Sequence, residues 1–320
     1  MYISQAYKGL HDGWRYVLGV LVSFFIGSQI IGALPLFGAI AYKSVKDGKA
    51  PNITDLNSIF TMFEPNITLV LILFPFLVGL VLLLIWNKVI HKGTLTWLTT
   101  SRSKIDWKRI FFAFGLWGLI TVVLTVVGYK MNPSGYVWNF DAQKFAILAI
   151  IAIVLVPIQT SFEEYLFRGY LMQGIGLASK NKWLPLVITS VVFGLMHIAN
   201  PEVEKIGYII MVYYIGTGFF LGILTLMDEG LELALGFHAA NNLITALLVT
   251  ANWTAFQTNS ILKDMSEPAA GIDVLIPVFV VFPILLFIFA KKYKWTNWNE
   301  KLFGKIEEPN SLEISDIGVE

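Results

Sequence analysis

Long, almost uncharged hydrophobic segments recur from end to end of the chain, separated by short polar connections. A bilayer core needs roughly 20 consecutive apolar residues in a helix. Six segments of about that length are Tyr16–Tyr42, Ile67–Trp86, Ile110–Tyr129, Phe145–Phe162, Ile206–Met227 and Ile272–Ala290. Two less pure ones are Trp183–Ile198, which contains His197, and Leu233–Thr250, which contains His238. Since lipid offers no partner for open backbone groups, the pattern predicts an all-α fold, a polytopic integral membrane bundle of about eight transmembrane helices.

A single transmembrane domain is expected over the whole chain, residues 1–320, because no polar stretch is long enough for a separate globular unit. Within it we expect N-terminal helices in 1–142, core helices in 143–251, a last helix in 252–290 and a polar tail in 291–320. If the N-terminus is cytoplasmic, the inner connections hold 15 Lys and Arg residues and the outer ones seven. The positive-inside rule then predicts cytoplasmic termini, for a protein of a bacterial plasma membrane.

Composition excludes a soluble domain and narrows the chemistry. Hydrophobic residues make up 56% of the chain and charged residues 14%, against about 45–50% and about 25% in soluble domains. The net charge of +1 argues against nucleic acid as a partner and leaves the lipid bilayer as the expected surrounding. The absence of cysteine removes disulfides, thiolate metal sites and a cysteine nucleophile.

Ionisable residues in or beside the apolar segments fall into three clusters. The clusters are Glu163-Glu164-Tyr165-Leu166-Phe167-Arg168, Phe193-Gly194-Leu195-Met196-His197 and His238-Ala239-Ala240-Asn241-Asn242. Such groups are costly in lipid and are usually functional or paired inside a bundle. Of the four histidines, only His197 and His238 lie deep in apolar sequence, which suggests a selected site.

Helical spacing assigns provisional partners within the clusters. Residues four apart share a helix face, so Glu164 and Arg168 can form an ion pair. Glu163 is rotated by about 100° from that face, which leaves its carboxylate free to act as a general base. His238 and Asn242 are also four apart, so we expect their donors to converge on one point.

Each cluster taken alone also has a purely structural interpretation. The Glu164–Arg168 pair can be a packing salt bridge, and a histidine or asparagine in a transmembrane helix is often an interhelical hydrogen-bond partner. Three clusters on three helices, all rich in acid–base groups, are much less typical of structural contacts alone. The combination therefore favours a functional site.

The three motifs together resemble a known family. Glu-Glu-x-x-x-Arg, Phe-x-x-x-His and His-x-x-x-Asn, in this order on membrane helices, are similar to the CPBP family, which includes type II CAAX prenyl endopeptidases and the bacteriocin-processing or Abi proteins. The matching stretch runs from about Gln143 to Thr250. The resemblance implies an intramembrane endopeptidase that acts on a hydrophobic or lipidated peptide.

The resemblance also implies a role for each motif position. The water-activating positions fall on Glu163 and His197, the supporting positions on Glu164 and Arg168, and the oxyanion-binding positions on His238 and Asn242. The cofactor is left open, as none or Zn²⁺. Glu163, His197 and His238 are a plausible zinc set with water in the fourth position. A metal-free reaction is slightly favoured, because Asn242 suits an oxyanion and is a poor zinc ligand.

Hairpin geometry sets a difficulty for such a site. Folding the chain about Lys180 brings Glu163 and His197 to equal depth. Counting helical rise from the Asp228–Gly230 turn in the same way, at about 1.5 Å per residue, puts His238 many ångströms nearer the cytoplasmic side. A shared site therefore requires helix tilt, or a bend among the glycines that follow the Glu163 motif.

Three classes of function fit these residues. Hydrolysis of a peptide bond in or at the membrane is the leading interpretation. The alternative is a non-catalytic membrane scaffold or bacteriocin self-immunity protein that has kept the residues. A proton-coupled transporter with a Glu and His relay is the third. The absence of an internal repeat and the specific partner Asn242 argue against transport.

Overall fold

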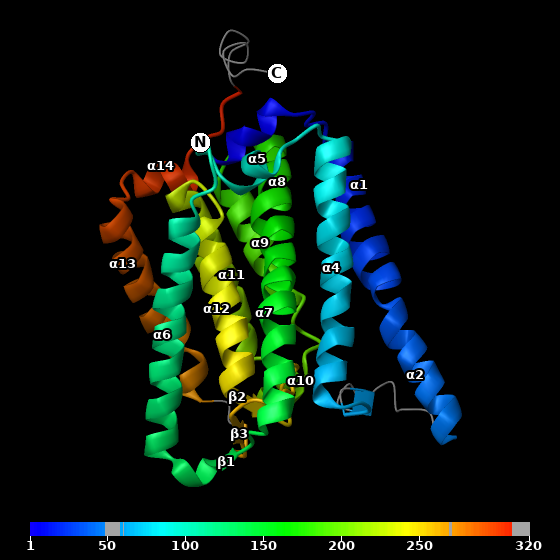
Figure 1. Cartoon of the computed structure of the whole chain (residues 1–320). Coiled ribbons are helices and arrows are strands. Elements are labelled where there is room, and N and C mark those ends of the chain that lie inside the picture. Colours follow the sequence, from blue (N-terminus) through cyan, green and yellow to red (C-terminus); the bar gives the residue numbers. More distant parts are fainter. Residues whose placement is uncertain (49–57, 60, 269–270, 309–320) are drawn as a thin grey trace.

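The computed structural model describes residues 1–48, 58–59, 61–268 and 271–308 as a bundle of helices that run side by side along one axis (Figure 1). Five helical spans among the described residues are long and apolar enough to cross a membrane. They are α1–η2–α2 (Gly13–Val20, Leu21–Gly32 and Leu34–Asp47), α4 (Pro65–Val89), α6 (Trp107–Met131), α7–η4–α8 (Ala142–Glu164, Tyr165–Leu171 and Met172–Ser179) and α11 (Ile210–Asp228).

Shorter helices form over the other three expected segments. They are α9 (Trp183–Leu195), α12 (Glu232–Leu248) and η6 with α13 (Pro277–Val281 and Phe282–Tyr293). All eight segments are therefore helical, although five of them meet the length of a complete span. The chain is an all-α integral membrane protein.

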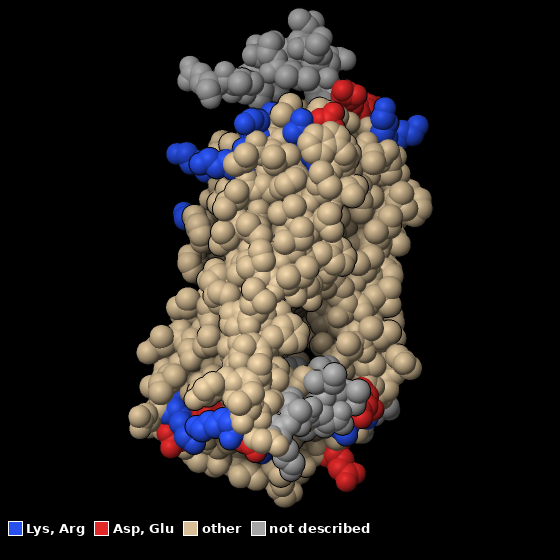
Figure 2. Space-filling view, turned by 90° about the vertical axis from the view of Figure 1, so that its right-hand side faces the viewer, with Lys and Arg blue, Asp and Glu red and all other residues tan. Residues whose placement is uncertain are grey.

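The two ends of the bundle carry different small elements. One end, called the terminal end below, holds η1 (Ile3–Lys8), α5 (Leu95–Thr99) and α14 (Trp298–Phe303). The opposite end, called the sheet end, holds β1 (Tyr136–Trp138), β2 (Val249–Ala251) and β3 (Leu262–Asp264). Near the sheet end are also η3 (Pro133–Gly135), α10 (Pro201–Ile206) and η5 (Ile272–Val274). Figure 2 shows charged residues gathered at both ends, with an almost uncharged band between them. This is the distribution expected for a protein whose middle lies in lipid.

The small sheet was not expected from the sequence. β3 pairs antiparallel with β1 and parallel with β2, so three segments far apart in the chain meet at the sheet end. The tail expected in 291–320 begins inside α13, which ends at Tyr293, and then contains α14. Lys182 Nζ donates to Glu300 Oε1 at 3.0 Å, which holds α14 against the start of α9. Residues 309–320 of the tail lie outside the described residues.

Acidic caps begin three of the long helices. Glu64, Asp106 and Asp141 accept backbone N–H groups at the starts of α4, α6 and α7. Such caps satisfy donors that have no partner in the first turn and place negative charge at the positive end of the helix dipole. The caps mark where each helix leaves the polar connection.

α12 is the central helix of the bundle. Eleven of its 17 residues are buried, because it packs against both α6 and α7. A Cβ at Gly236 would overlap the carbonyl oxygen of Ile110, so a glycine is needed where α12 approaches α6. The start of the third cluster, His238 to Ala240, is therefore buried, and Asn241 and Asn242 are half-buried.

The two hairpins turn at different depths, which removes the difficulty noted above. The Leu231 N–H donates to the Thr99 carbonyl at 2.7 Å, and a Cβ at Gly169 would lie 3.5 Å from Leu231 Cδ1. The α11–α12 turn is thus level with Gly169, whereas α8 continues for about 16 Å further before Lys180 at 1.5 Å per residue. His238 reaches the depth of the Glu163 motif because of this offset between the turns.

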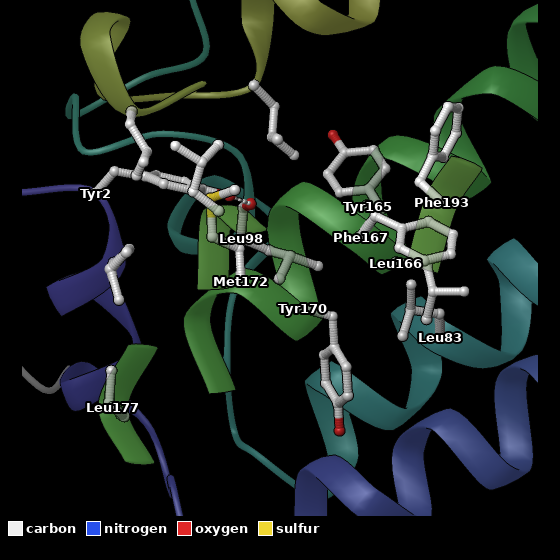
Figure 3. Packing of buried hydrophobic residues seen from close by; sticks show 14 of the residues in the cluster. Tyr2, Leu83, Leu98, Tyr165, Leu166, Phe167, Tyr170, Met172, Leu177 and Phe193 are labelled. Carbon is white, nitrogen blue, oxygen red and sulfur yellow. Dashed lines mark hydrogen bonds between the residues drawn. The ribbon is translucent and has the colours of Figure 1, made fainter. Parts of the chain in front are cut away.

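A buried layer closes the bundle at the terminal end. Tyr2 is completely buried there with Leu98 and Met172, and Tyr165 and Phe193 lie further along the same cluster (Figure 3). The Tyr2 hydroxyl lies 2.7 Å from the carbonyl oxygen of Leu98 and 3.2 Å from that of Arg168. The N-terminal segment therefore packs directly over the helix that carries the first motif.

Candidate functional site

Glu164 lies at the centre of a buried polar group. Its Oε1 accepts from Arg168 Nη1 at 3.1 Å and from His238 Nδ1 at 2.8 Å, and the side chains of Glu164 and Arg168 are completely buried. Arg168 Nη2 also donates to the Gly218 carbonyl at 3.1 Å, and its guanidinium lies 4.2 Å from the Phe193 ring centre. The expected ion pair is present, and α12 adds a partner that helical spacing did not predict.

Glu163 differs from its neighbour in its environment. Its Oε2 is buried, has no hydrogen-bond partner in the part of the chain that the structure describes, and lies 3.4 Å from His238 Nε2. The Glu163 side chain is 14% exposed, whereas that of Glu164 is 0% exposed. Glu164 is therefore paired through Oε1, although its own Oε2 is also buried without a partner among the described residues. Glu163 accepts no hydrogen bond from them, as the spacing predicts, and the His238 imidazole lies between the two carboxylates.

His197 follows the end of α9 and faces the same group. Its Nδ1 lies 2.8 Å from the Phe193 carbonyl oxygen, so Nδ1 carries the hydrogen and Nε2 is an acceptor in the neutral ring. Its ring stacks on Tyr214 with the centres 4.4 Å apart. The Phe193 ring lies 4.9 Å from the ring of His197 and 6.0 Å from that of His238. All three motifs thus meet around Phe193.

Asn242 does not share a target with His238. Its Nδ2 donates to Gln159 Oε1 at 3.0 Å, and its Oδ1 accepts from Asn241 at 3.0 Å. The ring nitrogens of His238 face the two carboxylates instead. The expected convergence of the His238 and Asn242 donors is therefore not met, because each has a closer partner on α7. One hydrogen on Asn242 Nδ2 remains a free donor.

The zinc alternative requires Glu163, His197 and His238 as ligands. In the described residues no group of three or more His, Asp or Glu side chains is arranged to hold a metal ion. His238 Nδ1 faces Glu164, and its Nε2 lies 3.4 Å from Glu163 Oε2, which is about the spacing of two ligands of one tetrahedral zinc ion. The third expected ligand, His197, is not gathered with them into such a group in this arrangement, and the reaction derived below uses no metal. The choice between no cofactor and Zn²⁺ stays a prediction.

Two neighbours of the site were missed by the motifs. Gln159 lies one turn before Glu163 and is 4% exposed, and its polar side chain inside an apolar run was a usable signal. Tyr214, which stacks on His197, has no such signal, because an aromatic residue in a transmembrane segment is ordinary.

Comparisons with known proteins identify a family for the part of the chain that holds the three motifs. Residues 142–244 match the family described as type II CAAX prenyl endopeptidase Rce1-like. The chain is 32% identical over 247 residues to the uncharacterized protein YyaK of Bacillus subtilis (strain 168), which covers 76% of this chain and 80% of that protein. It is 30% identical over 138 residues to an uncharacterized protein of Mycoplasma capricolum subsp. capricolum. That match covers 42% of this chain and 38% of the relative. No solved structure matches.

The chain belongs to the Rce1-like type II CAAX prenyl endopeptidase family. The matched region begins at the start of α7 and ends within α12, so it contains all three motifs. Its family is one of CAAX-type intramembrane proteases.

Proposed function

We propose that the protein is an intramembrane endopeptidase that hydrolyses a peptide bond of a hydrophobic or lipidated membrane-associated peptide with an activated water. The observation that carries the proposal is the contrast between the two carboxylates. Glu164 is completely buried and its Oε1 accepts from Arg168 and His238. Glu163 is 14% exposed and accepts no hydrogen bond from the described residues, and the Oε2 atom of each carboxylate is buried without a partner. A buried acceptor without a partner is costly, and a nucleophilic water supplies the missing donor.

Proton positions in the group follow from its contacts. His238 Nδ1 donates to Glu164, because a carboxylate oxygen only accepts. The Glu163 Oε2 and His238 Nε2 atoms, 3.4 Å apart, both carry lone pairs unless one is protonated. The two atoms can therefore form a hydrogen bond only through a proton that one of them carries, such as the proton that Glu163 takes from water in the reaction below.

The hydrolysis then proceeds through a tetrahedral intermediate. The water oxygen bonds to the peptide carbonyl carbon while Glu163, assisted by the free Nε2 of His197, takes a water proton. The carbonyl π electrons move to oxygen, and the free hydrogen of Asn242 Nδ2 stabilises the negative charge. The same role for His238 requires its ring to turn away from the two carboxylates. Collapse re-forms the carbonyl and breaks the C–N bond, and Glu163 returns the proton to the leaving nitrogen. The products are a carboxyl group and an amine.

We also place the protein in a bacterial plasma membrane with both termini in the cytoplasm. The Lys and Arg excess in the inner connections supports this orientation. The relatives named above are proteins of Bacillus subtilis and a Mycoplasma, which supports the bacterial membrane. The terminal end of the bundle then faces the cytoplasm.

The experiment compares purified protein with single variants on a library of hydrophobic and prenylated peptides. Glu163→Ala and His197→Ala should each abolish hydrolysis and remain folded in detergent. Glu204→Ala and His11→Ala are matched controls, because these residues lie outside the site, and both should retain activity. Asn242→Ala should lower turnover by roughly 10²–10³.

Elemental analysis of the same samples tests the cofactor. Hydrolysis that survives exhaustive chelation, without stoichiometric metal, supports the water mechanism derived above. Bound zinc whose removal ends activity contradicts it and makes Glu163, His197 and His238 the ligands. Absence of hydrolysis, with a cellular phenotype that persists in Glu163→Ala, favours the scaffold.

A further inference from the structure

A chain of side-chain hydrogen bonds crosses three helices beside the site. Trp117 Nε1, on α6, donates to Asn241 Oδ1 on α12 at 3.0 Å. Asn241 Nδ2 donates to the neighbouring Asn242 Oδ1 at 3.0 Å. Asn242 Nδ2 in turn donates to Gln159 Oε1 on α7 at 3.0 Å. The chain ends at Gln159.

The direction of this chain is set by its first member. An indole N–H can only donate, so Asn241 must present its oxygen to Trp117 and its NH₂ group to Asn242. The same choice then passes along the chain, and Gln159 must accept through Oε1. The orientation of each amide therefore follows from the network. Both hydrogens of Gln159 Nε2 are left at the end.

The free end lies where a substrate carbonyl would be bound. Gln159 precedes Glu163 by four residues on α7, and Asn242 follows His238 by four residues on α12, so the two pairs form successive levels of one helix–helix contact. One level holds Glu163 and His238, 3.4 Å apart, and the next holds Gln159 and Asn242. The free donor is therefore about one helical turn, about 5.4 Å, from the proposed base.

Burial makes the unpaired amide informative. Gln159 is 4% exposed, and no described residue accepts a hydrogen bond from its Nε2. The side chain is held almost entirely inside the protein, but its Nε2 is not itself a fully buried atom, so an acceptor supplied by a ligand can reach it. A peptide carbonyl is such an acceptor, and the amide is neutral and already oriented.

We propose that Gln159 Nε2 donates to the carbonyl oxygen of the scissile peptide bond and stabilises the negative charge that develops there. This inference rests on the proposed hydrolysis. In the attack step water adds to the carbonyl carbon, the π electron pair moves to the oxygen, and Glu163 takes the proton. Gln159 gains a stronger hydrogen bond in that step and transfers no proton. Trp117 and Asn241 are positioning residues that hold the terminal amide.

The test measures kcat and KM of the purified protein in detergent for the best peptide of the library. Gln159→Glu keeps the shape and the acceptor for Asn242 but removes both donors, and Gln159→Met removes the amide without adding charge. Each should lower kcat by roughly 10²–10³ and change KM much less. Two variants are used because a defect in folding of one, seen by gel filtration, does not affect the other.

Trp117→Phe tests the positioning role. It should lower kcat by a smaller factor than either Gln159 variant and should have no additional effect in a Gln159→Met background, since groups that act as a unit are not additive. Trp86→Phe is the matched control. It also removes an indole N–H, which donates to the Arg15 carbonyl at 3.0 Å at the terminal end, and it should leave kcat unchanged.

Each outcome decides one of the two proposals. If wild-type protein hydrolyses peptide and both Gln159 variants keep full kcat, the role of Gln159 is refuted and the peptidase stands. If the effects of Trp117→Phe and Gln159→Met simply multiply, the positioning role is refuted. If the wild type hydrolyses no peptide, the proposed function fails, and the role of Gln159 fails with it.

Discussion

Replacing Glu164 by glutamine removes the central charge of the buried group with almost no change in volume. The carboxylate accepts from both Arg168 and His238 through one oxygen. A glutamine at this position can keep an acceptor oxygen in the place of Oε1, but it carries no negative charge. Arg168 then loses the charge of its ion-pair partner, and its other favourable contacts are the Gly218 carbonyl and the Phe193 ring.

The cost follows from complete burial. Arg168 and Glu164 are both 0% exposed, so water cannot replace the lost charge. Removing one partner of a buried ion pair typically costs about 3–5 kcal/mol. Glu163→Gln should cost much less, because the Glu163 side chain is partly exposed and its Oε2 has no hydrogen-bond partner among the described residues to lose. We therefore expect a lower yield and a lower Tm for Glu164→Gln than for Glu163→Gln.

The assay compares detergent-solubilised yield and Tm of the two single variants with wild type, side by side. A double variant, Glu164→Gln with Arg168→Gln, is the control, because removing both charges should recover part of the loss. Equal behaviour of Glu163→Gln and Glu164→Gln would refute the argument. So would a double variant whose loss is the sum of its two single losses.

Two further predictions concern the ends of the bundle. Burial lowers the pKa of His91 from its ordinary value of 6.5. The stability that the neutral imidazole contributes is therefore present above about pH 6.5 and is lost as the pH falls toward the lowered pKa. Tm should drop more steeply from about pH 7 to about pH 5 in wild type than in His91→Gln, and equal slopes would contradict this. Because the chain has no cysteine, the single variants Lys104→Cys and Lys130→Cys each offer one thiol to a label. In intact cells, a maleimide that cannot cross the membrane should modify Lys130→Cys and not Lys104→Cys. The reverse pattern would contradict the proposal that both termini are cytoplasmic.

The helices could be predicted from the sequence because a long apolar segment in lipid can satisfy its backbone hydrogen bonds within itself only as a helix. Tyr136–Trp138 and Leu262–Asp264, the antiparallel strands of the sheet, are too short to show an alternating pattern, and their pairing joins distant parts of the chain. The sheet could not be predicted for that reason. The ion pair of Glu164 with Arg168 needed only the spacing within one helix.

Contacts between helices could be predicted only in part. The bond from His238 to Glu164 depends on the relative depth of α7 and α12, and equal depth of the two turns was the wrong assumption. The depth of the α11–α12 turn is fixed by Thr99, whose carbonyl oxygen accepts from the Leu231 N–H. The residues around Thr99 in the sequence give no sign of this contact. The Gln159–Asn242 contact was missed because it depends on the same alignment.

The length of α9 has a consequence for the supply of water. Its 13 residues extend only about 20 Å, against about 30 Å for the hydrocarbon core. The helix ends at Leu195, two residues before His197, and non-helical backbone at that depth needs protein or water around it. A thinner, hydrated bilayer beside α9 would meet this need, and in the proposed hydrolysis it would also supply the water. The rate of the proposed reaction would then depend on the thickness of the bilayer. Lipids with longer acyl chains should lower turnover although no residue of the site is changed.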